Sequence, residues 1–317
     1  MSATAVVFAY HNVGVRCLST LLAHGVKVPL VLTHQDSPGE NIWFGSVAQL
    51  ARDHDIPVLT PEDANQPEVL ARLREVGADY FFSFYYRQML KPELLALAAK
   101  GAYNMHGSLL PHYRGRVPVN WAIIRGERET GASLHEMVEK PDAGRLVDQQ
   151  AVPILPDDTA LDVFNKVTVA AEICLDRALP KILDGSACPT PLDLHRGNYC
   201  KGRKPEDGCI DWHQSARDIH NLIRAVAPPY PGAFTDLGTR RLFVLKSLPQ
   251  PERSPLPGGP GLYRDGERLY ADCGDGQVLR LLAAILAPDQ PRTVDGLTGL
   301  LTAEAFTEAF GRGKIAR

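Results

Sequence analysis

The sequence predicts an α/β fold: a doubly wound, Rossmann-like parallel sheet, followed by a second, smaller β-barrel domain of the OB type. Continuous apolar runs such as 5–10 and 80–86 suit strands that are buried on both faces. Segments with apolar residues at helical spacing separate these runs, which is typical of βαβ units. After about residue 185, short apolar runs between Gly/Pro turns favour a small barrel. We therefore expect a first domain over residues 1–200 and a barrel-like domain over 201–317.

The expected elements follow from the periodicity of the apolar residues. Strands are expected at 5–10, 28–33, 57–59, 80–86, 102–106, 132–138, 146–154, 242–245 and 278–282. Helices are expected from residue 14, and at 47–53, 67–76, 92–99, 117–125 and 159–183. Ser215 is placed to cap a further helix whose apolar face ends at Val226. A loop is expected at 249–261 and a frayed tail at 311–317.

Composition narrows the class of protein. The chain has 317 residues, of which 44% are hydrophobic and 22% charged, and a net charge of −3, so no nucleic-acid binding is expected. Six scattered cysteines, without a Cys-x-x-Cys pair or a zinc spacing, predict free thiols in a reducing compartment and no metal site. No signal peptide is apparent, and no stretch approaches the ~20 apolar residues of a membrane span. We expect a cytoplasmic protein without membrane insertion.

The first strand-to-helix turn argues against two common activities of this fold class. Residues 9–14 lack the Gly-x-Gly-x-x-Gly pattern that lets a pyrophosphate approach the backbone. A Gly-x-x-x-x-Gly-Lys phosphate loop is also missing from the sequence. Hydride transfer from a dinucleotide and phosphoryl transfer are therefore disfavoured.

Asn104 and His106 are the candidate reactive residues. Side chains alternate along a strand, so both point to one face where the strand 102–106 ends, and ligands bind at that edge of parallel α/β sheets. An imidazole, with a reference pKa of about 6.5, can hold or give a proton near neutral pH. An amide can hydrogen-bond an oxygen that becomes negative. The pair suits acyl transfer, although an isolated Asn-x-His is better explained as satisfied polar residues in a turn.

The run from Asn104 to Gly115, with Asn-x-His followed by Ser-Leu-Leu-Pro, resembles the signature of the 10-formyltetrahydrofolate-dependent formyltransferases. The resemblance implies formyl transfer from 10-formyltetrahydrofolate to an amine, without a metal. It also implies a third catalytic residue on a loop after the next strand, which Asp142 matches; taken alone, Asp142 before Ala-Gly would be a turn residue. In this reading Asp142 keeps His106 charged and oriented.

The same resemblance implies a folate pocket built by two loops. The matching residues are Gln88, Met89, Leu90, Val138, Glu139, Lys140, Pro141 and Asp142, and Arg116 would lie near the mouth. Backbone groups of such loops can read the hydrogen-bonding edges of a flat pteridine. For the side chains of Met89 and Leu90, ordinary core packing is nearly as good an explanation.

The acceptor is inferred from departures within the family. The loop 34–41 is short and acidic, whereas the tRNA formyltransferases carry a longer basic loop there, and Tyr113 stands where they tend to carry Trp. The runs 8–12 and 82–87 instead resemble the formyltransferase part of the bifunctional polymyxin-resistance enzymes, as do 120–121, 211–213, 224–226 and 230–234. That implies UDP-4-amino-4-deoxy-L-arabinose as acceptor, in lipid A modification.

Two expectations follow from this narrower resemblance. The bifunctional enzymes continue into a decarboxylase domain, so either a decarboxylase on a separate chain is a partner here, or the protein formylates a different nucleotide-linked amino sugar. The candidate contacts to the sugar nucleotide are Tyr10, Asn12, Arg203 and Arg224.

Three alternatives remain open from the sequence. Methionyl-tRNA formyltransferase would show salt-sensitive tRNA binding. A formyltetrahydrofolate deformylase, which shares the Asn/His/Asp set, would release formate without an amine. A binding protein that kept the fold would lack activity altogether.

Overall fold

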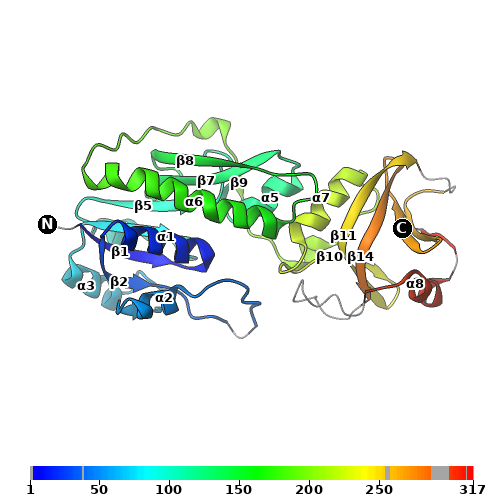
Figure 1. Cartoon of the computed structure of the whole chain (residues 1–317), viewed down its shortest axis with the longest axis horizontal. Coiled ribbons are helices and arrows are strands. Elements are labelled where there is room, and N and C mark those ends of the chain that lie inside the picture. The colour runs from blue at the N-terminus through cyan, green and yellow to red at the C-terminus, as the bar shows by residue number, and fades with distance from the viewer. Residues whose placement is uncertain (1–2, 38, 254–257, 287–299, 312, 317) are drawn as a thin grey trace. The chain divides into compact units, whose positions relative to one another are not determined.

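The computed structural model describes residues 3–37, 39–253, 258–286, 300–311 and 313–316 (Figure 1). The chain folds as two compact units. The first comprises residues up to 118, 129–153 and 164–201, and the second comprises 119–128, 154–163 and 202–317. The second unit thus includes two short segments from the middle of the chain.

The first unit is built on a seven-stranded sheet in the order β3-β2-β1-β4-β5-β7-β8. The strands are β1 (Thr4–Ala9), β2 (Lys27–Leu32), β3 (Val58–Leu59), β4 (Tyr80–Phe84), β5 (Gly101–His106), β7 (Glu129–Glu136) and β8 (Leu146–Pro153). The pairs among β1 to β5 are parallel, whereas β7 runs antiparallel to β5 and to β8. The predicted α/β class is confirmed, but the sheet is mixed, because β7 and β8 at one edge are antiparallel to each other. Residues 137–145, which join β7 to β8, are too few for the crossover that parallel strands need.

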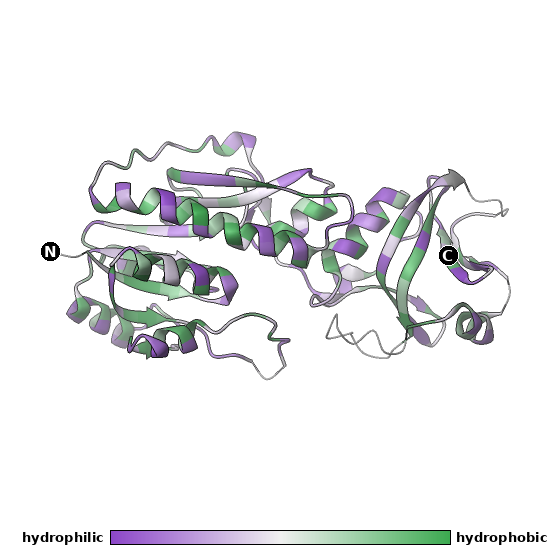
Figure 2. Cartoon of the chain, viewed as in Figure 1, coloured by the Kyte–Doolittle hydropathy of each residue, from purple (hydrophilic) through white to green (hydrophobic). Residues whose placement is uncertain are grey.

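Helices cover both faces of this sheet (Figure 1). The helices of the first unit are α1 (His11–Ala23), α2 (Val47–Asp53), α3 (Pro67–Val76), α4 (Pro92–Leu95) and most of α6 (Ala160–Leu183), whereas α5 (Pro118–Ile124) lies almost entirely in the second unit. Phe81 of β4 packs into the core cluster with α3 and α4, while the Tyr80 hydroxyl donates to the carbonyl of Ile182 in α6. Neighbouring residues of a strand face opposite sides, so α3 and α6 cover opposite faces. Figure 2 shows the hydrophobic and hydrophilic bands that make α6 amphipathic.

Two elements of the first unit are shorter than the sequence predicts. The helix expected at 92–99 ends at Leu95, and the strand expected at 80–86 ends at Phe84. Tyr85 adopts a left-handed φ of 58°, which turns the chain out of the strand. Two short pieces, β6 (Arg114–Gly115) and β9 (Tyr199–Cys200), pair with each other as a separate parallel ribbon.

The second unit contains an open antiparallel half-barrel, which confirms the expected class of the second domain. Its strand order is β10-β11-β14-β13-β12-β15. The strands are β10 (Ala233–Leu237), β11 (Arg240–Arg253), β12 (Gly261–Asp265), β13 (Arg268–Asp272), β14 (Gln277–Leu286) and β15 (Ile315–Ala316). The helical elements are α7 (Ala216–Val226), α8 (Ala303–Phe310) and the short turns η1 (Leu194–Arg196), in the first unit, and η2 (Pro205–Gly208).

Three local predictions concern the second unit, and the structure confirms one of them. The hydroxyl of Ser215 accepts from the backbone N–H of Asp218, so the predicted cap of α7 is confirmed. The loop expected from residue 249 is wrong over 249–253, which extend β11 through an irregular register against β14. The frayed tail is wrong for Ile315 and Ala316, which pair with β12. Among the described helices, none has both the length and the apolarity to cross a membrane.

Candidate active site

Asn104 and His106 lie at the end of β5, as predicted. This strand pairs with β4 on one side and with β7 on the other, in a register that sets Asn104 opposite His135 and His106 opposite Ser133. His106 is buried and Asn104 is half-buried. Both side chains are therefore fixed by strands on two sides.

The loop between β7 and β8 brings Asp142 to the same place. Its Oδ1 lies 3.5 Å from Nδ1 of His106, and its Oδ2 accepts a 2.8 Å hydrogen bond from the backbone N–H of Gly115. Asp142 has a left-handed φ of 51°, which is uncommon for a residue with a side chain. Such a conformation persists only where neighbouring contacts hold it, and Gly115 and His106 supply them.

Both nitrogens of His106 face hydrogen-bond acceptors. Nε2–H donates to the carbonyl of Tyr113 at 2.8 Å, and Nδ1 faces the Asp142 carboxylate. The Tyr113 peptide is itself held, because its N–H donates to the side chain of Asn198. A ring between a carbonyl and a carboxylate satisfies both acceptors when it carries two N–H groups, which is the cationic form.

Burial and the neighbouring histidine rings shift the pKa of Asp142 in opposite directions. Burial raises the pKa of this carboxyl, but the nearby His106, together with His135 and the Gly115 N–H, outweighs it. The net pKa of Asp142 therefore lies well below its usual range, and the group is a carboxylate at any physiological pH.

His135 is a member of this cluster that the sequence did not single out. Its Nε2 lies 3.1 Å from Nδ2 of Asn104 and 3.5 Å from Oδ1 of Asp142, while Nδ1 lies 2.7 Å from the carbonyl oxygen of Glu136. The side chain is buried. The predicted strand 132–138 contained this residue, but only the register between β5 and β7 reveals that it faces Asn104.

Gly107, next to His106, lies against the ring of Tyr85. A Cβ at this position would lie 1.8 Å from the Tyr85 hydroxyl oxygen. We expect Gly107→Ala to displace the tyrosine and to lower the free energy of unfolding by about 1–3 kcal/mol, the usual cost of overpacking. Denaturant unfolding measures this. The control is Gly39→Ala, whose Cβ would meet nothing within 4 Å; equal stability of the two variants would contradict the expected clash.

The residues predicted for the folate lie on two loops of the first unit. The Gln88 amide donates to the Glu62 carbonyl and accepts from the Ala64 N–H, so it joins its own loop to the segment that contains these two residues. Leu90 is buried in a core cluster that Met137 also contacts. Met89 and Val138 are 56% and 44% exposed, which leaves two apolar side chains open to a ligand. The remaining members of the predicted set, Arg116, Glu139 and Lys140, are exposed, and Pro141 is half-buried.

Tyr10 and Asn12, predicted to contact the acceptor, hold the loop that follows β2. The Tyr10 hydroxyl donates to Asp36 at 2.6 Å, and the Asn12 side-chain oxygen accepts from the Gly45 N–H at 2.7 Å. Both residues lie at the carboxyl ends of the parallel strands, where ligands bind in open α/β sheets.

Arg87 fastens the same loop through its guanidinium and its backbone. The guanidinium makes a two-point ion pair with Glu40, and the Arg87 N–H donates to Nε2 of His34. Burial and Arg87 lower the pKa of His34 to about 4, so its ring is neutral at physiological pH and can accept this bond.

Arg203 and Arg224, the other predicted contacts, lie in the second unit. Arg224 is buried; its guanidinium donates to the carbonyls of Leu155 and Asp158 and to Asn221. Arg203 lies 5.0 Å from the centre of the Trp121 ring and donates to the Asp207 carbonyl. These partners favour a structural role, above all for Arg224, and the predicted contact with a sugar nucleotide stays a prediction.

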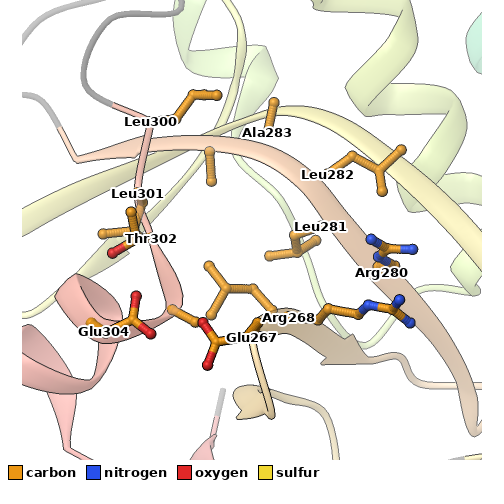
Figure 3. Close-up of a pocket in the computed structure, with 13 residues that line it drawn as sticks. Glu267, Arg268, Arg280, Leu281, Leu282, Ala283, Leu300, Leu301, Thr302 and Glu304 are labelled. Atoms are coloured by element: carbon orange, nitrogen blue, oxygen red, sulfur yellow. The ribbon is translucent and has the colours of Figure 1, made fainter.

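The half-barrel carries a hollow of its own, shown in Figure 3. It has a volume of about 360 Å3 and is lined by β13, β14 and the start of α8. The side chains of Arg268 and Arg280 lie on the same side of the hollow in Figure 3, and its apolar lining includes Leu281 and Ala283. None of the residues that line it was predicted as a site residue. Within the described part of the chain, no group of three or more His, Cys, Asp or Glu could hold a metal ion.

An open α/β sheet with an amide, an imidazole and a carboxylate at the end of one strand is typical of an enzyme that handles an acyl group. The family description of the formyl transferases matches residues 15–179, more than half of the chain, and that of their C-terminal domain matches residues 203–291. The chain therefore belongs to the formyl transferase family and is an enzyme of that family.

Solved structures share the fold. An N-formyltransferase from Helicobacter canadensis, crystallised with folinic acid and dTDP-3-aminofucose, is 21% identical over 89% of this chain and 99% of that chain, with a TM-score of 0.68. WlaRD, a sugar 3N-formyl transferase crystallised in the presence of dTDP and 5-N-formyl-THF, is 21% identical over 91% and 99%, with a TM-score of 0.69. HypX from Aquifex aeolicus, in complex with tetrahydrofolic acid, is 19% identical over 89% and 45%, with a TM-score of 0.60.

Proposed function

We propose that this enzyme transfers the formyl group of 10-formyltetrahydrofolate to the amine of a nucleotide-linked amino sugar, with UDP-4-amino-4-deoxy-L-arabinose as the acceptor. The observation that carries the proposal is the convergence of Asn104, His106 and Asp142 at the end of β5. The product would belong to lipid A modification, on the route linked to polymyxin resistance.

The bound folate supplies a formyl group on N10. Asn104 donates one of its two amide hydrogens to His135. The second amide hydrogen stabilises the negative charge that develops on the formyl oxygen while the sugar amine attacks the formyl carbon. Protonated His106 adds to this stabilisation and gives its proton to N10 as the bond between the formyl carbon and N10 breaks. Asp142 keeps His106 cationic and takes, through a water, the proton that the amine loses.

The hydrogen bonds of His106 set a condition for this step. Nε2–H is donated to the Tyr113 carbonyl in the structure, so that bond has to be exchanged for one to N10 before the proton moves. The Asp142 carboxylate lies 3.5 Å from the other nitrogen, so the ring keeps an anionic neighbour during the exchange.

The predicted folate loops suit a flat aromatic ligand. The exposed side chains of Met89 and Val138 offer apolar contact to the faces of a ring. Asn65 bonds the Met89 carbonyl and the Lys91 N–H, so the loop backbone that would read the ring edges is already ordered. Binding by an ordered loop costs little conformational entropy.

The loop after β2 supports a small nucleotide-linked acceptor over tRNA. Tyr10, Asn12 and Arg87 hold it against the edge of the sheet, and Arg87 is already neutralised by Glu40. A pinned acidic loop of this kind does not attract the phosphates of an RNA stem. Two proteins of the same fold were crystallised with dTDP-3-aminofucose and with dTDP, which supports a nucleotide-linked acceptor here.

The acceptor is tested by incubating the whole chain with 10-formyltetrahydrofolate and a panel of UDP- and dTDP-amino sugars, with mass spectrometry as the readout. We expect UDP-4-amino-4-deoxy-L-arabinose to gain a formyl group fastest. Formylation of a dTDP-sugar alone would change the nucleotide and the sugar in the proposal. An unmodified panel, together with formylation of charged initiator tRNA, would overturn it.

A further inference from the structure

We propose that His135 is a positioning residue that fixes which end of the Asn104 amide faces the reacting carbon. The inference rests on the proposed role of Asn104 and goes beyond it. His135 is 2% exposed and lies on β7, directly opposite Asn104 on β5.

The tautomer of His135 follows from its backbone partner. Nδ1 lies 2.7 Å from the carbonyl oxygen of Glu136, and a carbonyl can only accept, so the hydrogen is on Nδ1. In the neutral ring Nε2 then has a free lone pair. The group within hydrogen-bond distance of this lone pair is Nδ2 of Asn104, at 3.1 Å.

This arrangement orients an otherwise ambiguous side chain. An amide can present its oxygen or its nitrogen by a simple flip, and only the nitrogen can stabilise an oxyanion. With Nε2 as an acceptor, one N–H of Asn104 is held by His135 and the Nδ2 end stays inside the cluster. The flipped amide would set Oδ1 of Asn104 against the lone pair of His135, which is repulsive.

Asp142 offers a competing contact, because its Oδ1 lies 3.5 Å from Nε2 of His135, the same distance as from Nδ1 of His106. Nδ2 of Asn104 lies closer to Nε2 of His135, at 3.1 Å, which is within the range of an ordinary hydrogen bond. A bond to Asp142 would need a hydrogen on Nε2, and therefore a cationic His135, which could no longer accept from Asn104. The 3.1 Å distance thus favours a hydrogen bond from Nδ2 of Asn104 to Nε2 of His135.

The first test compares His135→Leu, which removes the acceptor, with His135→Gln, whose side-chain oxygen can reach the former Nε2 position. We expect His135→Leu to lower kcat about 10–100-fold, the usual loss when a supporting group no longer orients its partner, with KM for both substrates little changed. His135→Gln should restore most of kcat. A matched control is His220→Leu, which removes a buried histidine with two hydrogen bonds in the second unit.

The control separates positioning from loss of stability. His220→Leu should lower the unfolding temperature without changing kcat per folded molecule. If His135→Leu and His135→Gln both retain the wild-type kcat, or if both lose kcat equally while folded, the positioning role is wrong.

Two further measurements keep the test decisive. NMR of the isotope-labelled imidazole nitrogens in the intact chain should show His135 as the Nδ1–H tautomer; an Nε2–H tautomer would overturn the inference, whatever the variants do. In Asn104→Ala, the additional change His135→Leu should cost little more. If Asn104→Ala itself keeps full turnover, the proposed role of Asn104 fails; if it loses turnover while His135→Leu does not, only the present inference fails.

Discussion

His106→Ala is expected to lower kcat by about 10²–10⁴-fold, the range that a general acid or base contributes. Among the three proposed catalytic residues, the ring of His106 is the group that can give a proton to a leaving nitrogen, because the Asn104 amide does not titrate and Asp142 starts as a carboxylate. Turnover is measured with purified protein, 10-formyltetrahydrofolate and the amino sugar, at saturating concentrations of both.

Loss of the ring also removes the donor to the Tyr113 carbonyl, so stability needs its own control. His106→Gln keeps an amide N–H that can reach this carbonyl but cannot transfer a proton. We expect His106→Gln to unfold near the wild-type temperature and to be as inactive as His106→Ala. A folded His106→Gln variant with the wild-type rate would contradict the role of His106 as an acid.

Asp142→Asn is expected to have an effect of similar size, about 10²–10⁴-fold in kcat, because the variant keeps the shape of the side chain and removes its charge. The asparagine oxygen can still accept from the Gly115 N–H, so the loop should stay in place. Without the carboxylate, His106 loses the charge that favours its cationic form. KM for the two substrates should change far less than kcat, and a raised KM with unchanged kcat would contradict this role.

The pH dependence of stability offers a second readout for Asp142. Its pKa is lower in the folded chain than in the unfolded chain, so the ionised group stabilises the fold above the unfolded pKa of about 3.9. That contribution is lost as the pH falls through the folded pKa. The difference in the free energy of unfolding between wild type and Asp142→Asn should therefore be constant from neutral pH down to about pH 5 and should shrink only in stronger acid. A difference that stays constant through the acid range as well would show that the pKa of Asp142 is the same in the folded and the unfolded chain.

The order of buried strands and helices in the first unit could be predicted because each element has its own apolar period. The helix predicted at 67–76 illustrates this, since it begins at Pro67 and ends before Gly77, which has a left-handed φ, and the strand predicted at 102–106 is observed at 101–106. Strands that form only because they pair with a distant segment could not be predicted from local periodicity. Ile315 and Ala316 form a strand because β12 offers an edge, and residues 249–253 extend β11 because β14 continues beside them.

The site shows the same limit. Asn104, His106 and Asp142 stand in sequence patterns that carry their identity, whereas His135 has no signal apart from strand register. Arg224 illustrates the opposite error: an arginine is a natural choice for a pyrophosphate, but its partners here are the carbonyls of Leu155 and Asp158. Whether a charged residue serves a ligand or its own fold depends on contacts that the linear sequence does not contain.

The fate of the formyl carbon tests the proposed chemistry most directly. The intact chain is given 10-formyltetrahydrofolate labelled at that carbon, together with UDP-4-amino-4-deoxy-L-arabinose, and the label is followed by NMR. We expect the signal to move from the folate to a formamide on the sugar, and to stay on the folate when His106→Gln replaces the wild type. Release of the label as free formate, or transfer at the wild-type rate by the folded His106→Gln variant, would contradict formyl transfer by this cluster.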